Sequence, residues 1–200
     1  MQRYDFLKTI AGDVGDALVV SAGWAAREWQ ALRPNDGNFR TRTLGLASSI
    51  ALGVALGLPH RKIVVIDGDG AFLMNLCGLP TIAWQNPSNL IHLLFDNQCY
   101  EASGATNTAT VAGTDAIALA KGAGYKNACW AATPEQFREE FLAAWKKNEL
   151  SLIAAKVEQG QPASLTPIGV DEVENKYRFI RHIEETEKKV ILGPSDHRKK

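Results

Sequence analysis

Cysteine is scarce in this 200-residue chain, which contains only Cys77, Cys99 and Cys129. The three residues are far apart in the sequence, and no two of them form a CxxC pair. This pattern excludes the usual zinc-binding arrangements, cysteine-ligated iron–sulfur clusters and CxxC redox dithiols. An odd number of widely spaced cysteines also indicates no disulfide framework, so we expect the protein to work in a reducing compartment.

An excess of charge of either sign is also missing, because 22 lysines and arginines balance 22 aspartates and glutamates. Without a net positive field, we expect the chain to bind neither nucleic acid nor a membrane surface. Long apolar runs are absent too, since the first 24 residues mix charged and apolar positions and no window reaches membrane-spanning length. We therefore expect a cytoplasmic protein.

What the sequence does contain is an alternation of apolar, strand-like runs with segments of helical periodicity. Strands are expected at 17–21, 62–68, 90–97, 127–130 and 151–158. Helices are expected at 25–32, 47–58, 71–84, 115–122 and 134–147. Thr133 and Pro134 suit the N-cap and first position of the last helix. The pattern predicts an α/β protein with a doubly wound, mainly parallel sheet and helices on both faces.

One domain accounts for most of the chain, because 46% of the residues are apolar and suffice for one buried core. We expect this domain to span residues 1–160. The composition then changes to QGQPASLTPIG and to the charged segment ENKYRFIRHIEETEKK. Residues 161–200 are therefore expected to form a C-terminal arm with an exposed helix and a disordered end, PSDHRKK.

The segment VVIDGDGAF, residues 64–72, places two carboxylates directly after an apolar strand. Asp69 stands between glycines, which allow the backbone to approach a ligand closely. Asn97 follows the next apolar strand, and the carboxyl ends of neighbouring parallel strands lie at one edge of a sheet. Because Mg²⁺ prefers oxygen ligands, Asp69 and Asn97 are candidate ligands of a metal that also holds phosphate. A lone GDG, however, is also a common turn.

The succession of GDG, a helix, a strand and the pair Asp96-Asn97 resembles the thiamin diphosphate motif, in which two asparagines close the pattern. Asp96 replaces the first asparagine, whereas Asn97 retains the second. The stretch from RTLGLASSIALG to LLFDNQCYEASG is similar to the diphosphate-binding domain of the phosphonopyruvate and sulfopyruvate decarboxylase group, with weaker similarity to about Glu158. The resemblance implies thiamin diphosphate and Mg²⁺ as cofactors.

The resemblance also implies a set of site residues. Asp69, Asn97 and the backbone carbonyl of Cys99 would ligate Mg²⁺. The backbone amides of Gly70 and Ala71, which follow Asp69, would lie near the diphosphate. The turn between the first strand and its helix, at Gly23, would also lie near the diphosphate. The further cofactor-binding residues implied in this way are Gly23, Gly68, Gly70, Ala71 and Tyr100.

Upstream, Thr43-Leu44-Gly45 matches the last three residues of the family's G-[ST]-M-G element. By this match Leu44 would be the apolar wedge under the cofactor, although its spacing suits a core leucine equally well. Arg42 replaces the usual first glycine and brings a guanidinium near the substrate side. Arg40 and Arg42 could receive an acidic substrate group, or they could be solvated surface residues.

Glu101 and Ser103 follow Asn97 in a loop that closes the cofactor pocket in related enzymes, which makes them catalytic candidates. A Tyr-Glu-Ala-Ser-Gly loop is also ordinary solvent-facing sequence. In the family, the glutamate that promotes ionisation of the cofactor lies on a separate pyrimidine-binding domain. A chain of this length has room for only one of the two domains.

The resemblance thus implies the β-type, diphosphate-binding subunit of a two-subunit decarboxylase for a small 2-oxo acid, with a sulfonate or phosphonate among the candidate substituents. It would depend on a pyrimidine-domain, α-type partner, and its open, apolar interface would favour oligomers. Two alternatives stay open: a carboligase subunit that transfers the decarboxylated fragment to an aldehyde, and a non-catalytic cofactor-binding or regulatory subunit. The missing CxxC spacing disfavours half of a 2-oxoacid:ferredoxin oxidoreductase.

Overall fold

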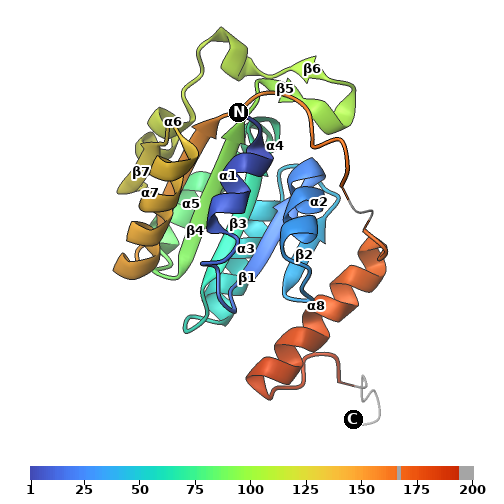
Figure 1. Cartoon of the computed structure of the whole chain (residues 1–200). Helices are drawn as coiled ribbons and strands as arrows, with labels where there is room; N and C mark the ends of the chain where they lie inside the picture. The colour runs from blue at the N-terminus through green and yellow to red at the C-terminus, as the bar shows by residue number, and fades with distance from the viewer. Residues whose placement is uncertain (166–167, 194–200) are drawn as a thin grey trace.

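The computed structural model describes residues 1–165 and 168–193, so the segment PSDHRKK, predicted to be disordered, lies outside it. Within the described residues, six strands form one sheet in the order β2-β1-β3-β4-β8-β7, and all neighbours are parallel. A small antiparallel hairpin lies beyond the carboxyl edge of this sheet (Figure 1). The strands are β1 Leu18–Ala22, β2 Asn38–Thr41, β3 Ile63–Gly68, β4 Leu90–Asp96, β5 Cys99–Tyr100, β6 Thr106–Asn107, β7 Asn127–Trp130 and β8 Ser151–Lys156.

Helices cover both faces of the sheet, which confirms the predicted doubly wound α/β fold (Figure 1). One face carries α1 Arg3–Ile10, α2 Gly23–Leu32 and α7 Pro134–Lys147. The opposite face carries α3 Ala47–Gly57, α4 Asp69–Met74, α5 Gly78–Gln85, α6 Ala116–Gly122 and α8 Glu172–Glu187. Short 3₁₀ helices occupy Glu101–Ser103 and Ala109–Ala112. No described helix combines the length and the apolar character needed to span a membrane.

The single helix predicted at 71–84 is wrong, because the structure has two helices, α4 and α5, in this region. The break falls at Asn75, whose side-chain amide donates a hydrogen bond of 2.8 Å to the hydroxyl of Ser49. Pro80 explains why one helix cannot run through, since its ring would clash with the carbonyl four residues earlier. In α5 the proline stands in the first turn, where a helix tolerates it.

Two elements absent from the sequence-based prediction, α1 and β2, complete the fold at its edges. The short strand β2 pairs with β1 and receives the C-terminal helix α8, whose Phe179 ring lies 5.4 Å from that of Phe39. Phe179 and Ile183 are 5% and 7% exposed, whereas Val173 and Tyr177 on the same helix are 64% and 50% exposed. Its amphipathic pattern buries one face against the sheet and leaves the charged face in solvent.

The chain reverses its winding direction between β1 and β3, which are neighbours in the sheet. From β1 it winds outward to β2, and from β3 it winds the opposite way to β4. Open α/β sheets bind ligands at the carboxyl ends of the strands beside such a switch point. The loops after β1, β3 and β4 converge there, and the segment after β8 passes over this edge before it descends to α8 (Figure 1).

Candidate functional site

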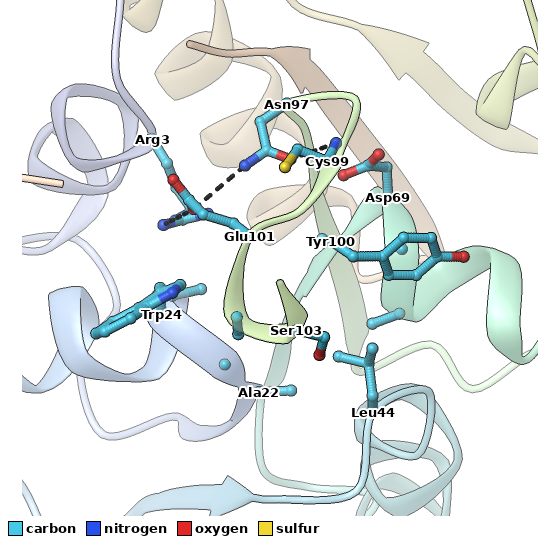
Figure 2. Close-up of a pocket in the computed structure, with 16 residues that line it drawn as sticks. Arg3, Ala22, Trp24, Leu44, Asp69, Asn97, Cys99, Tyr100, Glu101 and Ser103 are labelled. Carbon is cyan, nitrogen blue, oxygen red and sulfur yellow. Dashed lines mark hydrogen bonds and ion pairs between the residues drawn. The ribbon is translucent and has the colours of Figure 1, made fainter. Parts of the chain in front are cut away.

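A cavity at this switch point brings together segments that are far apart in the sequence. The predicted site residues that line it are Gly23, Leu44, Gly68, Asp69, Gly70, Ala71, Asn97, Cys99, Tyr100, Glu101 and Ser103. Thr43 and Gly45 flank Leu44 in the chain without belonging to the lining. Figure 2 shows Asp69, Asn97 and Cys99 close together on one side of the cavity, with Trp24, Leu44 and Ser103 around the other.

Asp69, the first residue of α4, is a buried carboxylate with 1% exposure. It accepts hydrogen bonds from the hydroxyls of Thr108 and Thr110, and among the described residues it forms no ion pair. Burial raises the pKa of the Asp69 carboxyl above its ordinary value, although the Thr108 hydrogen bond opposes the shift. A buried carboxylate without a counter-charge is costly, and a bound cation would remove that cost.

Asn97 and Cys99 lie beside Asp69 in the turn after β4. The Asn97 amide nitrogen donates to Glu101 Oε2 at 3.2 Å, and its oxygen accepts from the Cys99 backbone amide at 3.1 Å. Burial raises the pKa of the Cys99 thiol, so this side chain remains a neutral thiol and is a poor metal ligand. The donors offered here are a carboxylate, an amide oxygen and backbone carbonyls, which is a set that fits Mg²⁺ and not a soft metal.

A cluster of three or more His, Cys, Asp or Glu side chains with metal-binding geometry does not occur in the described part of the chain. A divalent ion at Asp69 would therefore need ligands beyond protein side chains. Mg²⁺ in proteins takes one or two carboxylates and completes its shell with phosphate oxygens and water. The sparse donor set is thus consistent with a metal that arrives together with a phosphate-bearing ligand.

Only glycine fits at position 70, because the Tyr100 ring occupies the space where a Cβ atom would lie. A Cβ atom at Gly70 would lie 2.5 Å from a carbon of the Tyr100 ring. The ring therefore lies over the first turn of α4, where backbone amides have no partner within the helix. The whole cavity, with the Tyr100 ring in its wall, has a volume of about 60 Å³.

Leu44 is half-buried, lines the cavity and lies outside both hydrophobic core clusters. This position argues against the alternative of a core leucine, while the wedge role stays a prediction. Gly45 follows with φ +89°, a left-handed conformation that glycine adopts without strain. A Cβ atom at Gly45 would also lie 3.2 Å from the Cβ of Met74, so the loop packs closely on the end of α4.

Two residues that sequence reasoning missed, Arg3 and Glu28, form a buried ion pair beside the cavity. The Arg3 guanidinium donates to both carboxylate oxygens of Glu28 at 2.8 Å. Burial raises the pKa of Glu28, although the Arg3 hydrogen bond opposes the shift. Arg3 Nη2 also lies 3.6 Å from Glu101 Oε2. A charged residue on the apolar face of the predicted 25–32 helix was the available indication of this pair.

Glu101 is held from three sides, by Arg3, by the Asn97 amide and by the backbone amide of Gly160. These contacts orient the Asn97 side chain and tie the segment after β8 to the site. Ser103, in contrast, is exposed in the same loop. The structure therefore gives the two catalytic candidates different surroundings: Glu101 suits a positioning role, whereas Ser103 is an exposed residue on the cavity wall.

Asp96, which replaces the first asparagine of the motif, points into the protein and serves the local structure. Its carboxylate pairs with the ammonium group of Lys156 and accepts hydrogen bonds from the Gln98 amide at 3.0 Å and the Thr110 hydroxyl at 2.8 Å. These contacts join the ends of β4 and β8 and hold the loop that supplies Thr108. Asp96 is thus fully engaged by neighbouring groups and does not contact Asp69 or Asn97 through a hydrogen bond of its carboxylate.

The geometry places the chain among α/β proteins that bind a phosphate-bearing ligand at a topological switch point. Comparison with known proteins is more specific. The family model described as "Thiamine pyrophosphate enzyme, C-terminal TPP binding domain" matches residues 18–155. The chain belongs to this family, as its thiamin diphosphate-binding domain.

Relatives that match along most of the chain are decarboxylases or their beta subunits. The sulfopyruvate decarboxylase subunit beta of Methanocaldococcus jannaschii is 36% identical over 186 residues, which cover 91% of this chain and 97% of the relative. The beta subunit of Methanococcus maripaludis is 30% identical, and the match covers 92% of this chain and 98% of the relative. The phosphonopyruvate decarboxylase of Streptomyces hygroscopicus is 33% identical and covers 74% and 37%. The predicted resemblance to this group is confirmed.

Solved structures share the fold at low sequence identity. Benzoylformate decarboxylase from Polynucleobacter necessarius has a TM-score of 0.66 at 20% identity, covering 84% of this chain and 34% of the neighbour. A thiamine diphosphate-dependent 4-hydroxybenzoylformate decarboxylase from Rhodococcus jostii has a TM-score of 0.67 at 18% identity, covering 81% and 33%. This chain thus spans about a third of the length of these enzymes.

Proposed function

We propose that this chain is the β-type, diphosphate-binding subunit of a thiamin diphosphate-dependent 2-oxo acid decarboxylase that a separate pyrimidine-domain subunit completes. The observation that carries the proposal is the share of each relative's length that this chain matches. The chain covers 97% and 98% of two sulfopyruvate decarboxylase beta subunits, but only about a third of enzymes such as benzoylformate decarboxylase. The relatives that match it from end to end are named as one subunit of a decarboxylase.

In this proposal Asp69, Asn97 and the carbonyl of Cys99 hold Mg²⁺, and the amides of Gly70 and Ala71 receive the diphosphate. The buried Asp69 carboxylate, which has no ion-pair partner among the described residues, supports the metal assignment. The Tyr100 ring, which lies close to Gly70, would form part of the wall around the diphosphate. The Thr108 hydroxyl, bonded to Asp69, would give way to the cation.

Bound thiamin diphosphate supplies a carbon nucleophile and an electron sink for the loss of CO₂ from a 2-oxo acid. This chain's residues then have three tasks. Asp69 and Asn97 would hold the diphosphate end through the metal, and Glu101 keeps the Asn97 amide in orientation. Leu44, in the cavity wall, would contact the cofactor. The acid that activates the cofactor would come from the partner, because Glu101 is already engaged by Arg3 and Gly160.

An apolar surface beside the site supports association with a partner or with a second copy. Helix α3 contains no charged residue, and its sequence is ASSIALGVALG. Leu46, Leu56 and Met74, on or next to this helix, are 43%, 49% and 59% exposed. Exposed apolar side chains on an uncharged helix suit an interaction surface. We propose that this surface is covered in the assembled enzyme.

The test is CO₂ release from 2-oxo acids with thiamin diphosphate and Mg²⁺, first by the chain alone and then with a candidate pyrimidine-domain subunit, to be sought first among the neighbouring genes. We expect no appreciable turnover alone and turnover with the partner. Robust turnover by the lone chain contradicts the split-site proposal. Product analysis in the same assay separates decarboxylation, which leaves a free aldehyde, from carboligation, which consumes an added aldehyde.

A further inference from the structure

A second cavity of about 320 Å³ adjoins the cofactor cavity at its open end. The two cavities share Gly23, Leu44 and Ser103 in their walls. The second one is also lined by three arginines, Arg27, Arg40 and Arg42, and by one acidic residue, Glu172. Its wall is therefore cationic, although the chain as a whole has no net charge. A local excess of positive charge beside a ligand site favours an anionic ligand.

Glu172 occupies the centre of this charge cluster. Its Oε1 lies 3.2 Å from Arg40 Nη2 and its Oε2 lies 3.6 Å from Arg42 Nη1. One carboxylate thus bridges two guanidinium groups, in the way that a carboxylate, sulfonate or phosphonate of a ligand would. Glu172 is the first residue of α8, on the C-terminal arm, so the bridging group is not part of the sheet that holds the cofactor cavity.

The arginines differ in how firmly they are held. Arg40 has a side chain only 17% exposed, and its Nη2 donates to the Val170 carbonyl at 2.9 Å. Arg42 is 78% exposed, and Arg27 stacks on the Trp24 ring with its guanidinium carbon 4.5 Å from the ring centre. Within the described residues Arg27 has no acidic partner. One fixed and two adaptable guanidinium groups can close around a small anion.

We propose that Arg40 and Arg42, assisted by Arg27, form the receptor for a second acidic group on the substrate, and that Glu172 occupies this receptor in the free chain. The inference rests on the proposed function, because it places the substrate between the cofactor cavity and the arginines. It assigns specificity for a 2-oxo acid with a second anionic group to residues of this subunit. Glu172 competes with that group and lowers the affinity for weakly charged acids.

A different result is expected if the ion pairs of Glu172 with Arg40 and Arg42 only stabilise the fold. If Glu172 only anchored α8, Glu172→Gln would lower the stability of the chain and leave its affinity for anions unchanged. If Glu172 occupies a receptor, Glu172→Gln frees two guanidinium groups and raises that affinity. Thermal unfolding of each variant, measured beside the binding titrations, separates loss of fold from loss of binding.

The experiment titrates the full chain, with Mg²⁺ and thiamin diphosphate present, with sulfoacetate and phosphonoacetate, and with acetate as the singly charged reference. We expect the doubly acidic probes to bind at least about tenfold more tightly than acetate, because a charge-assisted contact contributes about a factor of ten. Arg42→Gln and Arg40→Gln should each remove most of this preference, and Glu172→Gln should strengthen it about threefold. Arg40→Lys, which keeps the charge, should retain part of it.

Arg138→Gln is the matched control, because Arg138 is an exposed arginine that pairs with Asp13 away from both cavities. Equal binding of all three probes, or Arg40→Gln and Arg42→Gln variants that behave like Arg138→Gln, overturns the receptor. Cofactor titrations on the same samples separate the two proposals. Cofactor binding without a preference for doubly acidic probes overturns the receptor alone, whereas that preference without cofactor binding overturns the proposed function alone.

Discussion

The two ends of the site are built in different ways. At the diphosphate end, Asp69 and Asn97 are 1% and 6% exposed and are held by hydrogen bonds from neighbouring loops. At the arginine end, Arg42 is 78% exposed and its acidic contact comes from the C-terminal arm. Strand ends of one sheet thus create the first end, whereas the second joins the end of β2 to a separate helix, α8, and remains open to a substrate or partner.

The largest effect is expected from Asp69→Ala at the buried end. Loss of a direct metal ligand should lower the affinity for thiamin diphosphate with Mg²⁺ by more than about 100-fold, since even changes behind the ligands cost ten- to 100-fold. Stability should hardly fall, because the wild-type carboxylate is buried without a counter-charge in the described chain. Calorimetry with and without chelator measures the affinity. Asp16→Ala, in an exposed loop, is the control, and unchanged binding by Asp69→Ala contradicts the metal site.

Glu28→Ala tests the buried ion pair between Arg3 and Glu28, which lies beside the diphosphate end. It leaves Arg3 charged and buried, so the free energy of unfolding should fall by about 3 kcal/mol. Denaturant unfolding measures the loss. Glu139→Ala, an exposed glutamate in α7, should change stability far less. If both variants unfold at the same denaturant concentration, the ion pair contributes nothing to the fold.

Glu101→Gln and Ser103→Ala test two residues of the loop that lies between the two ends of the site. Glu101 orients Asn97, so Glu101→Gln should weaken cofactor binding by about tenfold. Ser103 is exposed, and Ser103→Ala should leave cofactor affinity within about twofold of the parent, as expected for a surface change. Calorimetric titration of the cofactor in Mg²⁺ is the measurement. A larger effect from Ser103→Ala than from Glu101→Gln reverses the assignment of the positioning role.

The smallest effect concerns Glu187, which anchors the far end of the helix that carries Glu172. Burial alone would raise the pKa of Glu187, but hydrogen bonds from His60 and Arg61 outweigh it and hold the pKa below its ordinary value of 4.5. Its stabilising contribution is therefore complete above pH 4.5 and is lost as the pH falls through the lowered pKa. Glu187→Gln should be less stable than the parent at neutral pH.

Thermal unfolding of both proteins between neutral and acidic pH tests the Glu187 prediction. The difference between parent and Glu187→Gln should shrink as the pH falls below the ordinary glutamate value, because protonation removes the charge from the parent as well. A constant difference across the whole range contradicts the assignment. Glu185→Gln, on the same helix, is the matched control.

Much of the sheet could be predicted because its strands carry local patterns. The run IVVIDG, now β3, is apolar until its end, and Thr133 and Pro134 cap α7 as expected. The break between α4 and α5 was predictable in principle from Pro80. Strand β2, with the sequence NFRT, was not, since four mixed residues carry no clear period. It is a strand because it pairs with β1 and packs against α8.

For this protein the sequence by itself determined the α/β class and the placement of Asp69 and Asn97 after two strands, since strand ends and turns depend on neighbouring residues. Only the tertiary structure decided that Arg3 and Glu28 pair beside the site, that Glu101 is engaged from three sides, and that Glu172 meets Arg40 and Arg42. Apart from the contact between Asn97 and Glu101, these contacts join residues more than twenty positions apart. Their energy depends on burial and distance, which the order of residues does not reveal before the chain is folded.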